Sequence, residues 1–279
     1  MAHKTKGFGV LLEAAGQERG RLCVGIDPHP YLLEKWGLEP TADGLRTFSM
    51  RCVEAFSDTA ALVKPQVAFF ERFGSQGFAV LEDVLTALRE VGCLTVADAK
   101  RGDIGSTMAG YADAWLDEAS PLRADSVTVS PYLGIGALGP VFAKAEATGR
   151  GVLVLAATSN PEARAIQAVP VGEESTIAQG VVDECASYNV AAHKTGSPGD
   201  IGVVVGATLD NPPRLDALNG PVLLPGVGAQ GAGPEQVHSI VSARPSLGFA
   251  NVSRAVLEQG PDVADLRKSV VRVAEEFRD

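Results

Sequence analysis

The sequence predicts an α/β fold in which eight parallel strands, each followed by a helix, close into a barrel. Eight short apolar runs recur along the chain, and a longer segment with helical character follows each of them. The runs are apolar almost throughout rather than alternating, as is typical of parallel strands covered on both faces. A length of 279 residues and a hydrophobic fraction of 46% fit one large domain with a sizeable core.

The strand and helix signals can be placed on the chain. Lys64 precedes Pro65, and the residue before a proline favours extended backbone, so Lys64 is expected at a strand end. Segments 80–91 and 108–119 carry apolar residues at helical spacing, and Gly92 ends the first of them. This alternation predicts a TIM, or (β/α)₈, barrel, with a doubly wound open sheet as the alternative. The predicted strands are residues 22–26, 61–64, 94–97, 126–129, 152–156, 202–205, 222–224 and 248–252.

Two regions of the sequence are less regular than the rest. Segment 160–200 is rich in proline and glycine, and it is interpreted as an elaborated loop plus one helix around 177–192 rather than as a linker. Residues 1–279 are therefore expected to form a single domain. Near the amino end, residues 10–12 belong to a short amphipathic stretch that Glu13 is expected to break.

The composition limits the classes of partner. Acidic residues outnumber basic ones by 34 to 24, which gives a net charge of -10 and argues against binding to nucleic acid or anionic membranes. No signal peptide and no run of 18 apolar residues is seen, so the expected location is the cytoplasm. The four cysteines and four histidines show no metal-ligand spacing, and the cysteines are expected to be reduced thiols.

The third apolar run ends in an unusual density of charge. Asp98 and Lys100 are two residues apart, so on a strand their side chains point to the same side, and Asp103 follows in a loop loosened by glycines. In a barrel, catalytic groups gather at the carboxyl ends of strands. The cluster therefore indicates a catalytic site, and a surface ion-pair cluster beside a helix cap is the alternative.

The seventh and eighth runs end in candidate phosphate-binding residues. Segment 225–234 is rich in glycine, and backbone N–H groups near Gly228 could cradle a phosphate. Arg254 follows the eighth run, and many barrels of this type bind phosphate between these two loops. The spacing also matches a dinucleotide-binding GxGxxG pattern, but Asn251 stands where that pattern needs an acid. For Arg254 alone, the alternative is a helix-surface residue.

Two further strand ends carry polar residues. The first run ends at Asp27, and the second holds Lys64. Each of them could be structural. A lone lysine at the end of a barrel strand could also be a Schiff-base lysine of an aldolase.

Taken together, these residues resemble orotidine 5'-monophosphate decarboxylases. The stretch from Asp98 through Lys100 and Asp103 to Ile104 matches the family signature DxKxxDI, and the rest of the pattern follows in order along nearly the whole chain. Segments 64–71 and 130–134 are most similar to the longer bacterial subgroup. The resemblance implies a cofactor-free enzyme that converts orotidine 5'-monophosphate to uridine 5'-monophosphate, the last step of pyrimidine nucleotide synthesis.

The resemblance also implies catalytic roles. Asp98 and Lys100 would face the departing carboxylate and C6 of the pyrimidine, with Lys100 as the proton donor. Lys64 would bind ribose and orient Asp98, and Asp27 would accept hydrogen bonds from the ribose hydroxyls. Asp103 would come from the partner subunit, so the enzyme is expected to be a homodimer that shares its active sites.

Other positions would bind the rest of the nucleotide. Thr107 would lie beside Asp103, and Ser159 would contact the pyrimidine ring. Gln230 and Arg254 would hold the phosphate. Many relatives have glycine where this chain has Ser253, so a hydroxyl is expected either to add a donor there or to crowd the site.

Two rival functions share the barrel. Hexulose phosphate synthases and keto-gulonate phosphate decarboxylases have a similar charged strand but use Mg²⁺ to hold an enediolate. A non-catalytic barrel that binds a phosphorylated ligand is the second alternative. The decarboxylase reading predicts activity without metal, because an electrostatic array and a lysine can stabilise and protonate a C6 carbanion.

Overall fold

The computed structural model describes residues 6–173, 175–228 and 231–278, and its eight strands form one sheet in the order β2-β1-β8-β7-β6-β5-β4-β3. The paired neighbours are parallel. Every strand predicted from the sequence is found, with ends shifted by a few residues, and the barrel prediction is confirmed over the open sheet. The strands are β1 (Leu22–Ile26), β2 (Leu62–Pro65), β3 (Val96–Arg101), β4 (Ser126–Val129), β5 (Gly151–Ala157), β6 (Ile201–Val205), β7 (Val222–Pro225) and β8 (Gly248–Val252).

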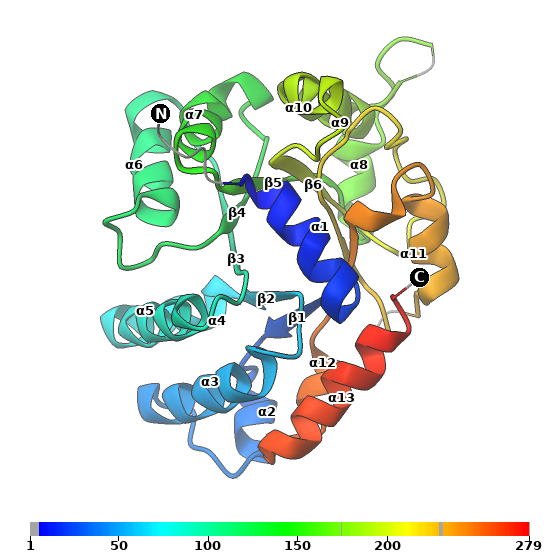
Figure 1. Ribbon diagram of the computed structural model, residues 1–279. Coiled ribbons are helices and arrows are strands. Elements are labelled where there is room, and N and C mark those ends of the chain that lie inside the picture. The colour runs from blue at the N-terminus through cyan, green and yellow to red at the C-terminus, as the bar shows by residue number, and fades with distance from the viewer. Residues whose placement is uncertain (1–5, 174, 229–230, 279) are drawn as a thin grey trace.

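Helices surround the sheet (Figure 1). Their inward faces and the outward faces of the strands form one continuous apolar core. Near the carboxyl ends of strands the helices are short, and the long ones run back beside the sheet. The helices are α2 (Pro30–Lys35), α3 (Ala42–Phe56), α4 (Val67–Glu71), α5 (Gly74–Glu90), α6 (Gly105–Leu116), α7 (Gly139–Thr148), α8 (Arg164–Gln167), α9 (Ile177–Tyr188), α10 (Val190–Lys194), α11 (Pro234–Ile240), α12 (Arg254–Leu257) and α13 (Val263–Glu275).

The strand ladder has a seam between β2 and β3. These two strands share only isolated bridges, Val63 with Thr95 and Gln66 with Asp98. The other neighbouring strands are joined by ladders, and two of these ladders, β3 with β4 and β5 with β6, contain a register shift. A backbone hydrogen bond from Val63 N to Leu94 O, at 2.9 Å, adds one link. The barrel therefore closes at this seam with fewer backbone hydrogen bonds than elsewhere.

Helix α1 (Phe8–Arg19) covers the amino end of the barrel. Phe8 and Leu12 pack on strand residues such as Leu62 and Phe249 in a second apolar cluster. The expectation that Glu13 breaks this segment was wrong, because the helix of 12 residues continues through Glu13 to Arg19. Glu13 accepts a hydrogen bond from Ser246 Oγ at 2.7 Å, so its charge is partnered at the helix surface. With this end closed, the carboxyl ends of the strands are left for a site.

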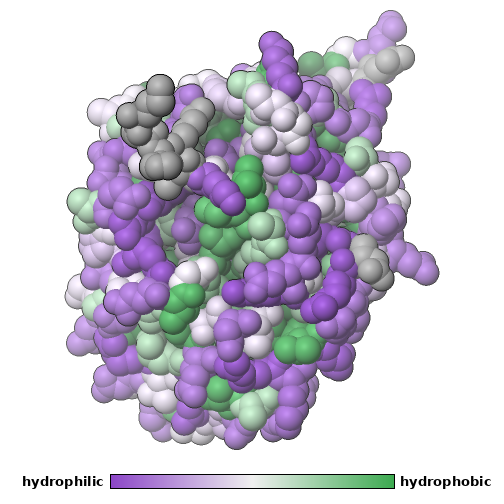
Figure 2. Space-filling view, in the orientation of Figure 1, coloured by the Kyte–Doolittle hydropathy of each residue, from purple (hydrophilic) through white to green (hydrophobic). Residues whose placement is uncertain are grey.

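Segment 160–200 differs from its prediction in one respect. The helix expected around 177–192 is divided at Asn189 into α9 and α10. The buried amide of Asn189 donates to the carbonyl oxygens of Ile201 and Leu218, at 2.7 and 2.8 Å, and so ties the break to the sheet. In the described part of the chain, no helix has the length and apolarity to cross a membrane. Figure 2 shows a mostly hydrophilic face with hydrophobic side chains gathered near its centre.

Candidate active site

Four charged side chains meet at the carboxyl ends of the first three strands. Asp27 follows β1, Lys64 lies in β2, and Asp98 and Lys100 lie in β3. All of them except Lys64 line a cavity of about 380 Å³, and Lys64 contacts two of its acids from behind. The lining residues are Asp27, His29, Gln66, Ala68, Phe69, Glu71, Asp98, Ala99 and Lys100. The spacing argument from the sequence is thus supported, since both Asp98 and Lys100 face this cavity.

Asp98 is the centre of the cluster, and each of its oxygens has two partners. Oδ2 lies 3.2 Å from Lys64 Nζ and accepts a hydrogen bond from Gln66 Nε2 at 2.8 Å. Oδ1 lies 2.6 Å from Lys100 Nζ and accepts from Thr128 Oγ1 at 2.8 Å. The side chain is only 10% exposed. A buried carboxylate with four partners is fixed in orientation, so one face of the cavity is preorganised.

The cations and anions of the cluster keep one another ionised. Burial alone would raise the pKa of Asp98, but Lys64 and Lys100 outweigh it and hold that pKa well below its usual range. Burial alone would lower the pKa of Lys64, but Asp27 and Asp98 raise it above its usual value. Lys64 therefore carries its charge at neutral pH although its side chain is only 3% exposed.

Asp27 retains capacity to accept a hydrogen bond. Its Oδ1 is buried and has no hydrogen-bond partner among the described residues, although Lys64 Nζ lies 3.7 Å away. A buried acceptor without a donor is costly unless something else supplies one. A hydroxyl group of a ligand in this cavity would do so.

Lys100 has an unusual backbone conformation. Its φ is 49°, and among the described residues other than glycine only Asn219 shares a positive φ. Such a conformation costs about 1–3 kcal/mol and persists only where its surroundings impose it. The backbone N of Lys100 donates to Thr128 Oγ1 at 2.9 Å, so the same hydroxyl that holds Asp98 also holds this turn.

Asp103 and Thr107 lie outside the cavity of their own chain. Asp103 is half-buried in the loop before α6 and accepts a hydrogen bond from Ile104 N at 2.8 Å. Among the described residues it has no ion-pair partner within the same chain. Thr107 is exposed in the first turn of α6. The sequence pattern brought these two residues near β3, but this chain alone does not bring them into the cluster.

The other expected ligand-binding residues lie on loops after β5, β7 and β8. Ser159 packs near Gly206, where an added Cβ would lie 3.0 Å from Ser159 N. Gly228 has a φ of 71° and donates from its backbone N to Ala232 O at 2.9 Å. Gln230 lies outside the described residues. Arg254 is exposed at the start of α12.

Ser253 turns inward rather than toward the solvent. A Cβ added at Gly25 would lie 1.9 Å from Ser253 Oγ and 2.9 Å from Asp27 Oδ1. The hydroxyl therefore occupies the space that the absent side chain of Gly25 leaves beside Asp27. The hydroxyl thus packs on β1, and whether it adds a donor at the phosphate site or crowds it stays a prediction.

Comparison with known proteins gives the family of the chain. The family model described as "Orotidine 5'-phosphate decarboxylase / HUMPS family" matches residues 20–269. The chain belongs to this family. It is 59% identical over 270 residues to an orotidine 5'-phosphate decarboxylase of Corynebacterium glutamicum (strain R), covering 97% of each protein. It is 60% identical over 273 residues to one of Corynebacterium efficiens, covering 98% of each.

Solved structures of the family agree with this assignment. A crystal structure from Streptomyces avermitilis, provisionally named an orotidine 5'-phosphate decarboxylase, has a TM-score of 0.93 at 47% identity and covers 99% of this chain and 96% of its own. The OMP decarboxylase of Leishmania donovani has a TM-score of 0.77 at 30% identity, with 97% of both chains covered. The family includes both decarboxylases and HUMPS proteins, but the 59–60% identical relatives carry the decarboxylase name.

The structure adds site residues to which the sequence reasoning gave no role. Gln66 and Thr128 both bind Asp98, and His29 lines the cavity with its ring 4.3 Å from that of Phe69. Two signals could have found them. Gln66 is two residues after Lys64, and Thr128 is a polar residue between two valines in β4.

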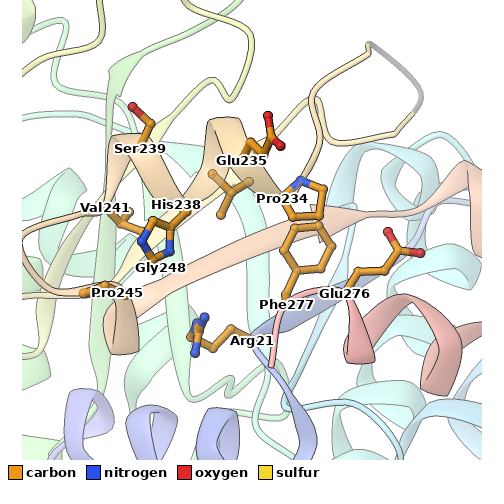
Figure 3. A pocket seen from close by; sticks show the side chains of 11 residues that line it. Arg21, Pro234, Glu235, His238, Ser239, Val241, Pro245, Gly248, Glu276 and Phe277 are labelled. Carbon is orange, nitrogen blue, oxygen red and sulfur yellow. The ribbon is translucent and has the colours of Figure 1, made fainter. Parts of the chain in front are cut away.

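A second cavity, of about 420 Å³, lies at the opposite end of the barrel (Figure 3). Arg21 precedes β1, Gly248 begins β8, and Phe277 follows α13, so the cavity is at the amino ends of strands. In this fold that end serves stability rather than catalysis. Among the described residues, no group of three or more His, Cys, Asp or Glu is placed to hold a metal ion.

Proposed function

We propose that the chain decarboxylates orotidine 5'-monophosphate to uridine 5'-monophosphate without a cofactor, using Lys100 as the proton donor. The observation that carries the proposal is the ion pair of 2.6 Å between Lys100 Nζ and Asp98 Oδ1 at the cavity. The names of the 59–60% identical relatives support the same reaction. As a member of the family the chain is a carboxy-lyase, so the proposal concerns how its residues act.

The proposed reaction consumes one proton and needs no other co-reactant. The bond between C6 and the carboxylate carbon breaks, CO₂ leaves, and the electron pair stays on C6. Lys100 stabilises the developing anion as a compact cation and transfers a proton from Nζ to C6. Solvent then restores the proton on Lys100.

Asp98 would act on the carboxylate that departs. Its four partners hold it in place, so it cannot turn away from a second anion beside it. Two adjacent carboxylates repel each other, and that repulsion is relieved when CO₂ leaves. Since an enzyme typically lowers a barrier by about 8–23 kcal/mol, this pair acts together with the cations and the phosphate grip.

The remaining roles follow the shape of the nucleotide. Lys64 and the open acceptor of Asp27 suit the ribose hydroxyls. Ser159 would contact the pyrimidine ring. Gly228, Gln230 and Arg254, on the loops after β7 and β8, would hold the phosphate, which suits glycine-rich backbone and a guanidinium.

We further propose a homodimer in which Asp103 enters the partner's site with Thr107 beside it. The loops after β3 and β4 carry exposed apolar side chains, with Ile104 61%, Tyr132 80% and Leu133 53% exposed. The loops are neighbours, because Ser130 N donates to Arg101 O at 2.7 Å. An apolar patch beside an acid that has no ion-pair partner among the described residues suits a contact with a second copy.

We also propose a domain organisation, a location in the cell and limits on the partners of the protein. The whole chain, 1–279, forms one barrel domain, since α1 and α13 at its two ends both pack on the sheet. The protein acts in the cytoplasm, where its substrate would be made and where its buried cysteines stay reduced. It binds neither nucleic acid nor membranes, in keeping with a net charge of -10.

An ultraviolet assay with orotidine 5'-monophosphate tests the function. We expect loss of substrate absorbance at the same rate before and after exhaustive treatment with EDTA. A strict Mg²⁺ requirement would support the sugar-phosphate lyase alternative. Tight binding of uridine 5'-monophosphate with no release of CO₂ would support a non-catalytic barrel.

A further inference from the structure

The turn that presents Lys100 to the cavity is held from its outer side by the next residue. Arg101 follows Lys100 in β3, and its guanidinium lies against α4 and α6. It does not line the cavity. Sequence reasoning assigned Arg101 no role, and the proposed chemistry does not use it.

The guanidinium of Arg101 joins three elements. Nη1 donates to the carbonyl oxygen of Ala99 at 2.8 Å, and Nη2 pairs with Glu71 at the end of α4. The guanidinium carbon lies 5.8 Å from the ring centroids of both Tyr111 and Trp115 in α6. The side chain is 22% exposed. This arrangement uses the planar fork of arginine, which lysine cannot reproduce.

These contacts close a bridge across the left-handed residue. Ala99 and Arg101 flank Lys100, so the bond from Nη1 to Ala99 O spans the turn that contains the positive φ. The main chain is also held on the β4 side, because Lys100 N donates to Thr128 Oγ1 and Arg101 O accepts from Ser130 N. A strained conformation persists where surrounding contacts over-determine it. The Arg101 bridge is the part of that restraint contributed by a side chain outside the cavity.

We propose that Arg101 is a positioning residue, which together with Glu71 holds the Lys100 turn so that the ammonium is fixed against Asp98 at the reacting carbon. The inference rests on the proposed role of Lys100. Substrate binding depends on other groups, including Asp27, Lys64 and Arg254. Loosening the turn therefore lowers kcat and leaves substrate affinity nearly unchanged, since a small misplacement of a reacting group is costly for the chemical step.

The chain offers a matched control in Arg150. Its Nη1 donates to Leu116 O at 2.9 Å, and its Nη2 pairs with Glu118 Oε1 at 2.7 Å, so it too bridges a carbonyl and a glutamate. Its side chain is 11% exposed. It precedes β5, at the amino end of the barrel and away from the cavity. Replacing either arginine by lysine removes the same kind of bridge, but only one bridge adjoins Lys100.

The experiment measures kcat and KM for orotidine 5'-monophosphate, together with thermal unfolding, in Arg101→Lys and Arg150→Lys. We expect Arg101→Lys to lower kcat by about 10- to 100-fold with KM changed less than about threefold. Arg150→Lys is expected to keep kcat within about twofold, with a similar fall in Tm. A kcat for Arg101→Lys within about threefold of wild type, or an equal loss in Arg150→Lys, overturns the proposal.

Glu71→Gln serves as a second variant in case Arg101→Lys does not fold. The amide still accepts a hydrogen bond from Nη2 but loses the charge, so a smaller fall in kcat in the same direction is expected. If Arg101→Lys does not fold, an unchanged kcat for Glu71→Gln rejects the positioning role. If the wild-type chain itself shows no decarboxylation, the proposed function fails and not this inference. If the wild type is active and the kcat of the variants is unchanged, the inference is rejected but the proposed function is not.

Discussion

The hydroxyl of Thr128 joins Asp98 to Lys100, because it donates to Asp98 Oδ1 at 2.8 Å and accepts from the backbone N of Lys100 at 2.9 Å. One buried group in β4 thus holds both the carboxylate and the turn of the lysine. This pair of hydrogen bonds, here called the Thr128 relay, connects the sheet directly to the groups proposed to react.

Thr128→Val tests the relay, since valine has nearly the same shape but neither donates nor accepts. We expect a loss of about 1–3 kcal/mol in the free energy of unfolding, because Asp98 Oδ1 and Lys100 N each lose a buried partner. We also expect kcat to fall by about tenfold or more as the turn loosens. Thr128→Ser keeps the hydroxyl and should retain most activity. Equal behaviour of the two variants would contradict the relay.

Acid titration tests the charged cluster. Asp98 has a pKa below its usual range, so its stabilising effect is complete above the unfolded-state pKa of about 4 and is lost as the pH falls through the lower folded-state value. Asp98→Asn should lower the free energy of unfolding by about 3–5 kcal/mol at pH 7. This difference from wild type should shrink below about pH 4.

Urea unfolding between pH 7 and pH 3 measures that difference. Asp216, which is exposed, provides the control, and Asp216→Asn should show little difference from wild type at any pH. A constant difference between Asp98→Asn and wild type across the range would show that the carboxylate of Asp98 is not stabilised by its cations.

Subunit mixing tests the shared site. Lys100→Ala and Asp103→Asn should each be nearly inactive as homodimers. A mixed dimer keeps one intact site, so an equimolar mixture after exchange should recover about one quarter of wild-type activity, because half of the dimers are mixed. Lys100→Ala mixed with Asp98→Asn is the control. These two residues lie in one strand, so no mixed dimer would contain an intact site, and recovery there would contradict the arrangement.

Arg254→Ala tests the phosphate grip. Removing a hydrogen bond between charged groups costs about 1.5–3 kcal/mol, so KM should rise by about 10- to 100-fold. Arg267→Ala, which removes an exposed arginine paired with Asp58 on the helical surface, should leave KM unchanged. Steady-state kinetics gives KM for both variants. An unchanged KM for Arg254→Ala would remove that residue from the phosphate site.

Ser253 and Gly25 should be energetically coupled. Gly25→Ala would bring a Cβ to within 1.9 Å of Ser253 Oγ, so we expect a loss of about 1–3 kcal/mol in the free energy of unfolding. Adding Ser253→Gly should restore part of it, since only Asp27 Oδ1 at 2.9 Å would remain close. A double-mutant cycle in urea gives the coupling, and strictly additive losses would argue against the contact.

Much of this arrangement follows from local sequence patterns. Asp98 and Lys100 could be assigned to one side of a strand because alternation along a strand is geometric. Lys64 could be placed at a strand end because Pro65 restricts its backbone. These inferences need only neighbouring residues, and the structure places all three side chains together.

Other features depend on contacts between distant residues. Gln66, just after β2, and Thr128, in β4, both reach Asp98. Their polarity marks them as candidates, but only the register between strands shows that Asp98 is their shared partner. Glu13 in α1 accepts a hydrogen bond from Ser246, which is 233 residues away in sequence, so no local pattern reveals that its charge has a partner. The positive φ of Lys100 likewise reflects tertiary restraint rather than residue preference.

The sparse pairing between β2 and β3 has a consequence for how the ring of strands behaves. Lys64 lies on the β2 side of this seam and Asp98 on the β3 side. Their ion pair therefore joins the two strands where few backbone hydrogen bonds do so. A nucleotide that binds both residues would strengthen this connection between β2 and β3. Ligand binding in the cavity should thus slow the local opening of β2 and β3 along their length, although the ligand covers only their ends.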